Sequence, residues 1–333
     1  MKGSRPFVGQ LFERLAHEAG VEVVVEPQFG YVGQVICPNG KVHYFRNTNF
    51  DLNPIGSTEI ARDKDYANFF MARLGYPVIE GQPFYSKKWC ENIGIDKGID
   101  AAYDYALSLG FPVIVKPNSK SQGTAVCKAN TKTEFFQACR KAFHCDNVIL
   151  VQRFIKGKDY RIVVLDGEVI SAYERIPLKI VGDGSHTIRE IMDIAQVNFF
   201  ADGRETRLPI DDYRVKQRLR RMNLTLETVL PEGQKCQLLD NANLSNGGTS
   251  IDATSQIHPG YRDIAVKLTT DMGLRYCGVD LMVENDLTQP PGIYHVIEIN
   301  AAPGIDNYAA SGEDQARIVD QLYVKVLKAI ARL

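Results

Sequence analysis

The chain has 333 residues, of which 44% are hydrophobic and 24% are charged, a balance typical of a globular protein with two or three packed units. A formal net charge of -1 argues against proteins that work by neutralising nucleic-acid phosphates or by lying on an anionic membrane, and no stretch approaches the roughly 18 apolar residues that span a bilayer. The seven cysteines lack the paired spacing of a disulfide framework or a zinc site, so we expect a cytoplasmic protein without nucleic-acid or membrane partners.

The first 56 residues predict a short α/β lobe. Apolar positions at helical spacing indicate a helix over residues 8–19, and Gly20 is expected to end it. A β-branched strand follows at residues 21–25. Asn39 and Gly40 mark the turn of a hairpin between residues 30 and 45.

Residues 57–151 predict a second, central lobe in which helices alternate with buried strands. Ser57 is expected to cap a helix whose apolar side includes Phe69, Phe70 and Leu74. Further helices are predicted at residues 100–109 and 133–143, and strands at residues 111–117 and 148–151. The first of these strands ends at Pro117, which stops the pairing.

Residues 152–333 predict a third lobe. A hairpin over Asp166 and Gly167 joins strands at residues 161–165 and 168–172. Residues 182–240 read as an insertion with helices at 186–196 and 211–222. Beyond it we predict a helix at 263–272, strands at 276–283 and 294–299, and a closing helix at 313–333.

Three oxygen-bearing side chains interrupt the last two predicted strands, namely Asp280, Glu298 and Asn300. Side chains alternate between the faces of a strand, so Glu298 and Asn300 project together. If the two strands are neighbours, all three groups converge. Two carboxylates and an amide suit Mg²⁺, which keeps waters and phosphate oxygens in its other positions. The alternative is a set of polar groups at a surface edge.

A loop rich in small and hydroxyl-bearing residues follows Lys116, which itself ends an apolar strand. Backbone N–H groups and hydroxyls in such a loop are able to surround phosphate oxygens, although an ordinary polar turn explains the composition equally well. The chain contains neither a Walker A loop nor a dinucleotide-binding fingerprint.

The segment at residues 152–161 predicts a strand that leaves its sheet at Gly157. A free strand edge offers the donor and acceptor that an adenine ring needs, and Phe154, Ile155 and Met282 are candidates for its apolar faces. A plain hairpin is the alternative.

The predicted helix at residues 211–222 is strongly basic. Arg214, Arg218 and Arg221 share one face of it, which suggests either an anionic-ligand site or a solvated helix. We favour the solvated helix.

In this order along the chain, Lys116, the segment 152–159, Asp280 and the pair Glu298 and Asn300 resemble ATP-grasp enzymes over roughly residues 57–304. Residues 181–188 and 243–252 resemble the ATP-grasp domain of cyanophycin synthetases and, less closely, that of bifunctional glutathione synthetases. The resemblance implies a mixed α/β (α+β) fold in which two lobes clasp ATP behind a short amino-terminal lobe.

The resemblance also implies a role for each matching residue. Contacts to the ATP phosphates would come from Lys64 and Lys116, and a mobile phosphate lid from Ser119, Ser121, Gly123 and Thr124. The nucleoside would lie against Gln152, Phe154, Ile155, Met282 and, at the ribose, Asp159. Magnesium, or manganese in its place, would be held by Asp280, Glu298 and Asn300. The transferred phosphoryl group would lie near Arg161 and Arg175, and the acyl phosphate near Asn243, Ser245, Gly247 and Gly248.

By the same resemblance we expect an ATP-dependent ligase that joins a small carboxylate to an amine through an acyl phosphate and releases ADP. Its substrates would be amino acids or small peptides, and its assembly a monomer or a homodimer. Alternatives are a dipeptide synthetase similar to D-alanine–D-alanine ligase and a non-catalytic ATP-binding regulatory subunit. The Mur-ligase-like half of cyanophycin synthetases is not recognised here, so cyanophycin polymerisation is not expected. Replacing Asp280 and Glu298 with alanine is predicted to abolish ADP formation and leave the fold intact.

Overall fold

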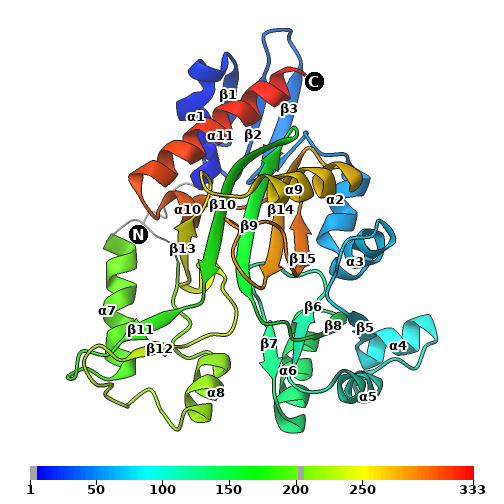
Figure 1. The fold of residues 1–333 in the computed structure, drawn as a ribbon. Coiled ribbons are helices and arrows are strands. Elements are labelled where there is room, and N and C mark those ends of the chain that lie inside the picture. Colours follow the sequence, from blue (N-terminus) through cyan, green and yellow to red (C-terminus); the bar gives the residue numbers. More distant parts are fainter. Residues whose placement is uncertain (1–5, 202–205) are drawn as a thin grey trace.

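The structure is a computed structural model that describes residues 6–201 and 206–333. It is mixed α/β, with four sheets of four, five, two and four strands. In Figure 1 the amino-terminal sheet lies at the top, the five-stranded sheet in the middle, and the central sheet and the two-stranded ribbon at the bottom. None of the helices in the described parts of the chain combines the length and the apolar character needed to cross a membrane.

The amino-terminal lobe follows the sequence prediction closely. Helix α1 (Phe7–Ala19) ends at Gly20, whose φ of 72° is left-handed. An antiparallel sheet then forms in the order of the chain, from β1 (Glu22–Val25), β2 (Val32–Ile36), β3 (Val42–Arg46) and β4 (Asn49–Phe50).

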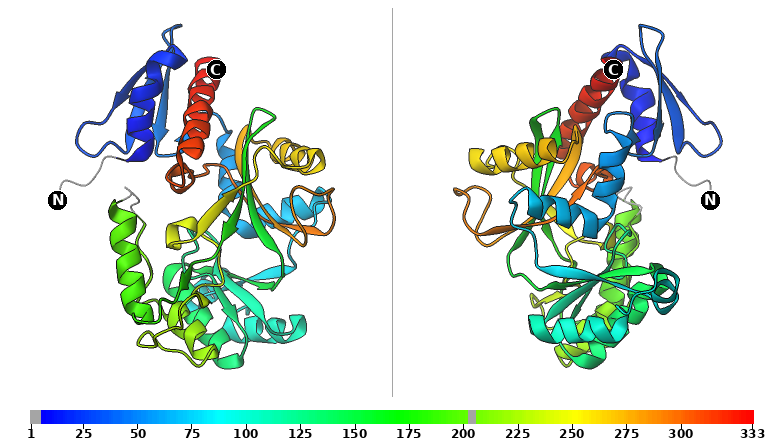
Figure 2. Two further views of the ribbon diagram at one scale, coloured as in Figure 1. Left: turned by 60° about the vertical axis from the view of Figure 1, so that its left-hand side comes forward. Right: turned by 90° about the vertical axis from the view of Figure 1, so that its right-hand side faces the viewer.

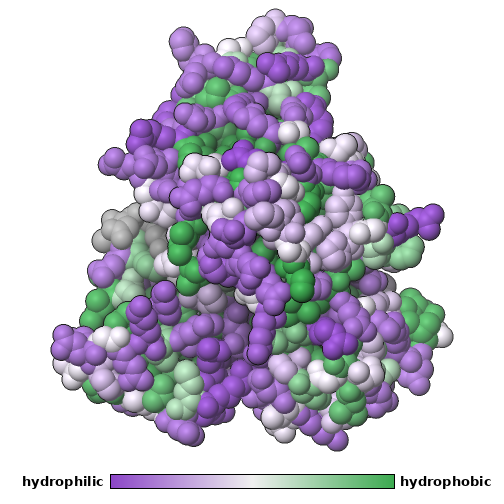
Figure 3. Space-filling model, in the orientation of Figure 1, coloured by the Kyte–Doolittle hydropathy of each residue, from purple (hydrophilic) through white to green (hydrophobic). Residues whose placement is uncertain are grey.

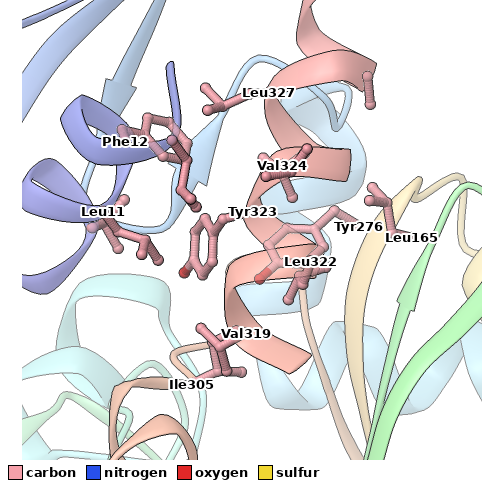
Figure 4. Packing of buried hydrophobic residues seen from close by; sticks show 14 of the residues in the cluster. Leu11, Phe12, Leu165, Tyr276, Ile305, Val319, Leu322, Tyr323, Val324 and Leu327 are labelled. Atoms are coloured by element: carbon pink, nitrogen blue, oxygen red, sulfur yellow. The ribbon is translucent and has the colours of Figure 1, made fainter. Parts of the chain in front are cut away.

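The core of this lobe also contains the end of the chain. Helices α10 (Asp306–Ala309) and α11 (Glu313–Ala331) supply part of it, and α11 packs beside α1 (Figures 1 and 2). The ring of Phe12 lies 4.9 Å from that of Phe45 and 5.7 Å from that of Tyr323 (Figure 4). Residues 8–52 therefore share one hydrophobic core with the last helix.

The helix expected from Ser57 is two helices, α2 (Ile55–Arg62) and α3 (Lys64–Arg73). Pro54, not Ser57, precedes the first of them. The break falls at Asp63, whose carboxylate accepts a 2.9 Å hydrogen bond from the backbone N–H of Tyr66 and so caps α3. The predicted apolar side is also wrong, because Phe69, Phe70 and Leu74 are exposed while Ala67 and Met71 are buried. Because a new helix starts after Asp63, the spacing of apolar residues counted from Ser57 does not continue into α3.

The central sheet has the strand order β5-β8-β6-β7 and carries α5 and α6 on one face. Sequence patterns identify both helices and the two inner strands, but not the short edge strands. The elements are β5 (Gly81–Tyr85), α4 (Lys87–Ile93), α5 (Ile99–Leu109), β6 (Val113–Pro117), β7 (Cys127–Ala129), α6 (Lys132–Cys145) and β8 (Val148–Arg153).

The five-stranded sheet has the order β13-β10-β9-β14-β15 and is covered on one face by α9. Strands β14 and β15 are antiparallel neighbours in which Asp280 lies opposite Glu298. The condition for the three oxygen groups to converge is therefore met. The elements are β9 (Lys158–Leu165), β10 (Glu168–Ile176), the 3₁₀ turn η1 (Leu244–Asn246), β13 (Thr249–Asp252), α9 (Pro259–Asp271), β14 (Tyr276–Val283) and β15 (Tyr294–Asn300).

The insertion is a small unit with its own hydrophobic core. Its two predicted helices are α7 (Ile188–Ala201) and α8 (Tyr213–Arg221). An antiparallel ribbon of β11 (Lys179–Val181) and β12 (Lys235–Gln237) closes its base. Each ribbon strand has three residues, too few for an alternating pattern to be visible in the sequence.

Candidate active site

Lys116 lies where the central sheet faces the five-stranded sheet. In β6 the residues Val113 and Val115 point into the core beneath α5 and α6, so Lys116 points to the opposite face, where it is only 5% exposed. Lys64, the first residue of α3, places its Nζ 3.8 Å from the Oε2 of Glu298 on β15. Three distant segments thus bring two lysines to one carboxylate.

The charges in this cluster change one another's proton affinity. Burial lowers the pKa of Lys116 to about 8, with Lys64 lowering it further and Glu298 opposing the change. Burial alone would raise the pKa of Glu298, but Lys64, Lys116 and the neighbouring arginines lower it to about 2. Glu298 is therefore a carboxylate at neutral pH, and Lys116 is mainly protonated.

Asp280 is fully buried and held by two arginines. The Nε of Arg161 donates to Oδ1 of Asp280 and the Nη2 of Arg161 donates to Oδ2, both at 2.7 Å. The Nη2 of Arg175 lies 2.9 Å from the same Oδ2. Nearby carboxylates raise the pKa of both guanidinium groups despite burial, which acts in the opposite direction. We therefore expect the replacement of Asp280 to destabilise the fold, because it would leave two buried cations without their shared carboxylate.

The three oxygen groups fit a divalent cation unequally. A carboxylate has about four acceptor positions. At Asp280 two of them accept hydrogen bonds from Arg161, and Arg175 adds an ion pair to Oδ2. Glu298 is more available, because its nearest hydrogen-bond donor is the Asn300 amide at 3.4 Å. No group of three His, Cys, Asp or Glu side chains within residues 6–201 and 206–333 is arranged to hold a metal. A cation here would need the Asn300 oxygen together with water or phosphate oxygens.

Arg175 joins this cluster to Asp159. Its Nε and Nη2 lie 3.0 and 2.6 Å from the Oδ1 of Asp159, and Arg175 is 7% exposed. Both hydrogen bonds go to the same oxygen, so Oδ2 has capacity for another donor such as a ribose hydroxyl. Burial raises the pKa of Asp159, and Arg175 opposes that change. Lys64, Lys116 and the two arginines outnumber the three carboxylates, so the whole cluster favours an anionic ligand.

The predicted nucleoside residues lie at the edge of the same face. Gln152 pairs with Ile114 in the sheet and is 2% exposed, with its amide donating to the Ile79 carbonyl at 3.4 Å. Gly157 approaches Met282 so closely that a Cβ there would lie 2.9 Å from Cγ. The sequence prediction missed Lys128 of β7, which lies opposite Ile114 and places Nζ 3.8 Å from the centre of the Phe154 ring. Ile155 is partly buried beside it.

The residues of the predicted phosphate lid, Ser119, Ser121, Gly123 and Thr124, lie in a loop over residues 119–126 that we call the lid, and its start is fixed by hydrogen bonds. Lys64 donates to the carbonyl of Lys120 at 2.6 Å, which fixes the start of the loop to α3. The hydroxyl of Ser119 donates to Asp146 at 2.7 Å, and that of Thr124 donates to the carbonyl of Ser121 at 2.9 Å. In this arrangement both hydroxyls donate to acceptors of the protein, so the groups facing a phosphate would be backbone N–H groups and lysines.

The lid contacts the predicted acyl-phosphate loop directly. The carbonyl of Gln122 accepts hydrogen bonds from Ser245 at 3.5 Å and from Asn246 at 3.2 Å. A Cβ at Gly123 would clash with the side chains of Asn241 and Asn243. Two segments that are far apart in sequence, each with a predicted role at the reacting phosphate, therefore meet in space.

Two residues of the acyl-phosphate loop have packing reasons for being glycine. Gly247 has a φ of 87°, and a Cβ there would clash with Leu208. A Cβ at Gly248 would lie 2.8 Å from the carbonyl oxygen of Ile176. The loop is thus packed tightly between the insertion and β10, and its glycines alone do not indicate a ligand.

Comparisons with known proteins identify the family of this chain. Residues 70–205 match the model of the D-ala D-ala ligase C-terminus, and residues 237–322 match the RimK-like ATP-grasp domain. The chain is 30% identical over 302 residues to the glutathione biosynthesis bifunctional protein of Streptococcus thermophilus, and 31% identical over 281 residues to cyanophycin synthetase of Trichormus variabilis. The chain belongs to the ATP-grasp superfamily.

These relatives are much longer than the ATP-grasp chain described here. The matches cover 86% and 82% of this chain, but 38% and 30% of the two relatives. Among solved structures, a bifunctional glutathione synthetase from Pasteurella multocida matches with a TM-score of 0.59 at 24% identity, covering 97% of this chain and 44% of that one. D-alanine–D-alanine ligase from Bacillus anthracis matches with a TM-score of 0.50 at 15% identity, covering 84% and 70%. Both confirm the ATP-grasp fold.

Proposed function

We propose that this ATP-grasp chain is an ADP-forming ligase that joins a small carboxylate to an amine. The observation that carries the proposal is the meeting of Lys64 and Lys116 with Asp280, Glu298 and the buried arginines between two sheets. Such a cluster has the charges that ATP phosphates and a transferred phosphoryl group require.

In the proposed reaction a substrate carboxylate attacks the γ-phosphorus of ATP. Lys64 and Lys116 neutralise the phosphate oxygens, and Arg161 and Arg175 stabilise the transferring group. Glu298 and Asn300 would hold Mg²⁺, or Mn²⁺ in its place, together with a lone pair of Asp280 that the arginines leave available. The metal would add Lewis-acid stabilisation of the phosphates.

The resulting acyl phosphate is then attacked by an amine, which forms an amide and releases phosphate. The lid protects the anhydride from water during this interval, because it lies against the loop that contains Asn243 and Ser245. No side-chain nucleophile takes part. The chemistry therefore depends on positioning and charge.

The two principal alternatives predict different products. A dipeptide synthetase similar to D-alanine–D-alanine ligase would join two amino acids, while a regulatory subunit would bind ATP without consuming it. The test is a matrix of amino acids and dipeptides incubated with ATP and Mg²⁺, read out by released phosphate and by product mass. Substrate-dependent phosphate release with an amide product supports the ligase. Nucleotide binding without turnover across the matrix would favour the regulatory subunit.

The proposed role of Lys116 predicts a pH dependence. The protonated amine is needed to hold ATP, and its pKa in the free protein is about 8, so kcat/KM for ATP should fall about tenfold per pH unit above that value. This decline is not an unfolding effect. The unfolded chain holds the Lys116 proton more tightly than the folded one, so this group increases stability as pH rises from 8 towards the ordinary lysine value. A pH profile with parallel thermal unfolding checks both statements, and a flat profile to pH 9.5 would contradict the assignment.

A further inference from the structure

The basic helix α8 reaches the phosphate lid through one residue. The Nη1 of Arg214 donates to the carbonyl of Gly123 at 2.8 Å and to that of Val126 at 3.4 Å. The Arg214 side chain is 12% exposed. Two other arginines of the same helix instead pair with acids near the helix, Arg218 with Asp240 and Arg221 with Glu134.

Arg214 is itself fixed within the insertion. Asp212 accepts from the Nε of Arg214 at 3.1 Å and from its Nη2 at 2.8 Å, while also capping the start of α8. The adjacent Tyr213 packs against the core of the central unit and contacts Cys127. The guanidinium is therefore held rigidly, with its Nη1 directed at the lid. In Figure 3 hydrophilic residues line the surface where the insertion faces the central unit.

The lid backbone needs such support. Gln122 and Ala125 have φ values of 56° and 51°, and Gly123 lies between them at 68°. Left-handed backbone is unfavourable for a residue with a side chain, and such conformations persist where the surroundings fix them. Within the lid, backbone hydrogen bonds run from the N–H of Thr124 to the carbonyl of Ser121 and from the N–H of Val126 to the carbonyl of Gly123. The carbonyls of Gly123 and Val126 accept hydrogen bonds from the insertion, and that of Gln122 accepts them from the loop after it.

We propose that Arg214 is a positioning residue that holds the phosphate lid closed before nucleotide arrives, so that the insertion sets the affinity for ATP. This inference rests on the proposed function for the identity of the nucleotide. Without Arg214 the lid would have to become ordered when ATP binds. The cost would appear as weaker binding, while the chemical step, which Arg214 does not touch, would change little.

The test compares Arg214→Gln with Arg220→Gln, a matched control on the same helix whose side chain is exposed. Hydrogen exchange of the lid amides in the full chain measures lid order without any substrate. We expect Arg214→Gln to accelerate exchange at Thr124 and Val126 roughly tenfold and to raise KM for ATP roughly 10- to 100-fold, with kcat within about threefold. Arg220→Gln should match the parent protein in all three measurements.

Two further variants separate positioning from folding. Arg214→Lys keeps the charge opposite Asp212 but offers a single ammonium, so its KM should lie between those of the parent and Arg214→Gln. Gly123→Ala displaces the lid from the opposite side, through Asn241 and Asn243, and should reproduce both changes even if Arg214→Gln unfolds. Unchanged lid exchange and unchanged KM in Arg214→Gln and Gly123→Ala would overturn the inference. A parent protein that shows no ATP turnover would instead overturn the proposed function, because the exchange measurement needs no nucleotide.

Discussion

Replacing Asp280 with alanine is expected to lower the free energy of unfolding by about 3–5 kcal/mol, the cost of leaving buried charges without a partner. Asp280 has no exposed surface and is the shared partner of Arg161 and Arg175. Its removal therefore leaves Arg161 with Glu298 alone, at 4.0 Å, and Arg175 with Asp159 alone. Thermal and denaturant unfolding of the variant measure the loss.

A matched control separates this effect from the loss of any aspartate. Asp263 lies exposed on α9, so Asp263→Ala should change stability by less than about 0.5 kcal/mol. Asp280→Asn keeps one acceptor oxygen and should lie between the two. Equal stability of the Asp280→Ala and Asp263→Ala proteins would show that the arginines relax into water, contrary to the network described above.

Replacing Lys116 with methionine should reduce kcat/KM for ATP by about 10²–10³-fold, the range found when one preorganised electrostatic donor is removed. Stability should be unchanged or slightly higher. Methionine has a similar shape, and its introduction removes a desolvated charge whose pKa is already lowered by burial. The two readouts together distinguish loss of a phosphate contact from loss of structure.

Lys88→Met provides the comparison for this variant, because Lys88 is exposed on α4 and remote from the charge cluster. It should retain full activity and stability. If Lys116→Met binds and turns over ATP like the parent, Lys116 has no role at the phosphates and the proposed chemistry loses its main cation.

The strands that carry the candidate metal ligands could be predicted because each has a long apolar run. In β14 and β15 the oxygen groups of Asp280, Glu298 and Asn300 stand out against buried neighbours, and alternation fixes the face on which they lie. The pairing of β14 with β15 did not follow from periodicity, because periodicity does not indicate which strands are neighbours. That information came from the resemblance and then from the structure.

The interactions that modify the site were beyond the reach of local patterns. The arginines that pair with the Asp280 carboxylate come from β9 and β10, and this pairing depends on the order of the strands in the sheet. Lys128 lies on a three-residue strand with no detectable period. The break at Asp63 was hidden because the apolar residues of α2 and α3 suggested one helix, although Asp63 has the capping chemistry that marks a helix start.

The shared core of α1 and α11 has a consequence for synthesis on the ribosome. Phe12 is buried partly by Tyr323, so this lobe leaves the exit tunnel before α11 and lacks part of its cover until nearly the whole described chain has been made. During that delay its sheet would expose apolar side chains and unpaired strand edges, the features that attract chaperones or cause aggregation. Nascent chains halted before α11 should therefore be protease-sensitive in their first fifty residues, and should become resistant once that helix emerges.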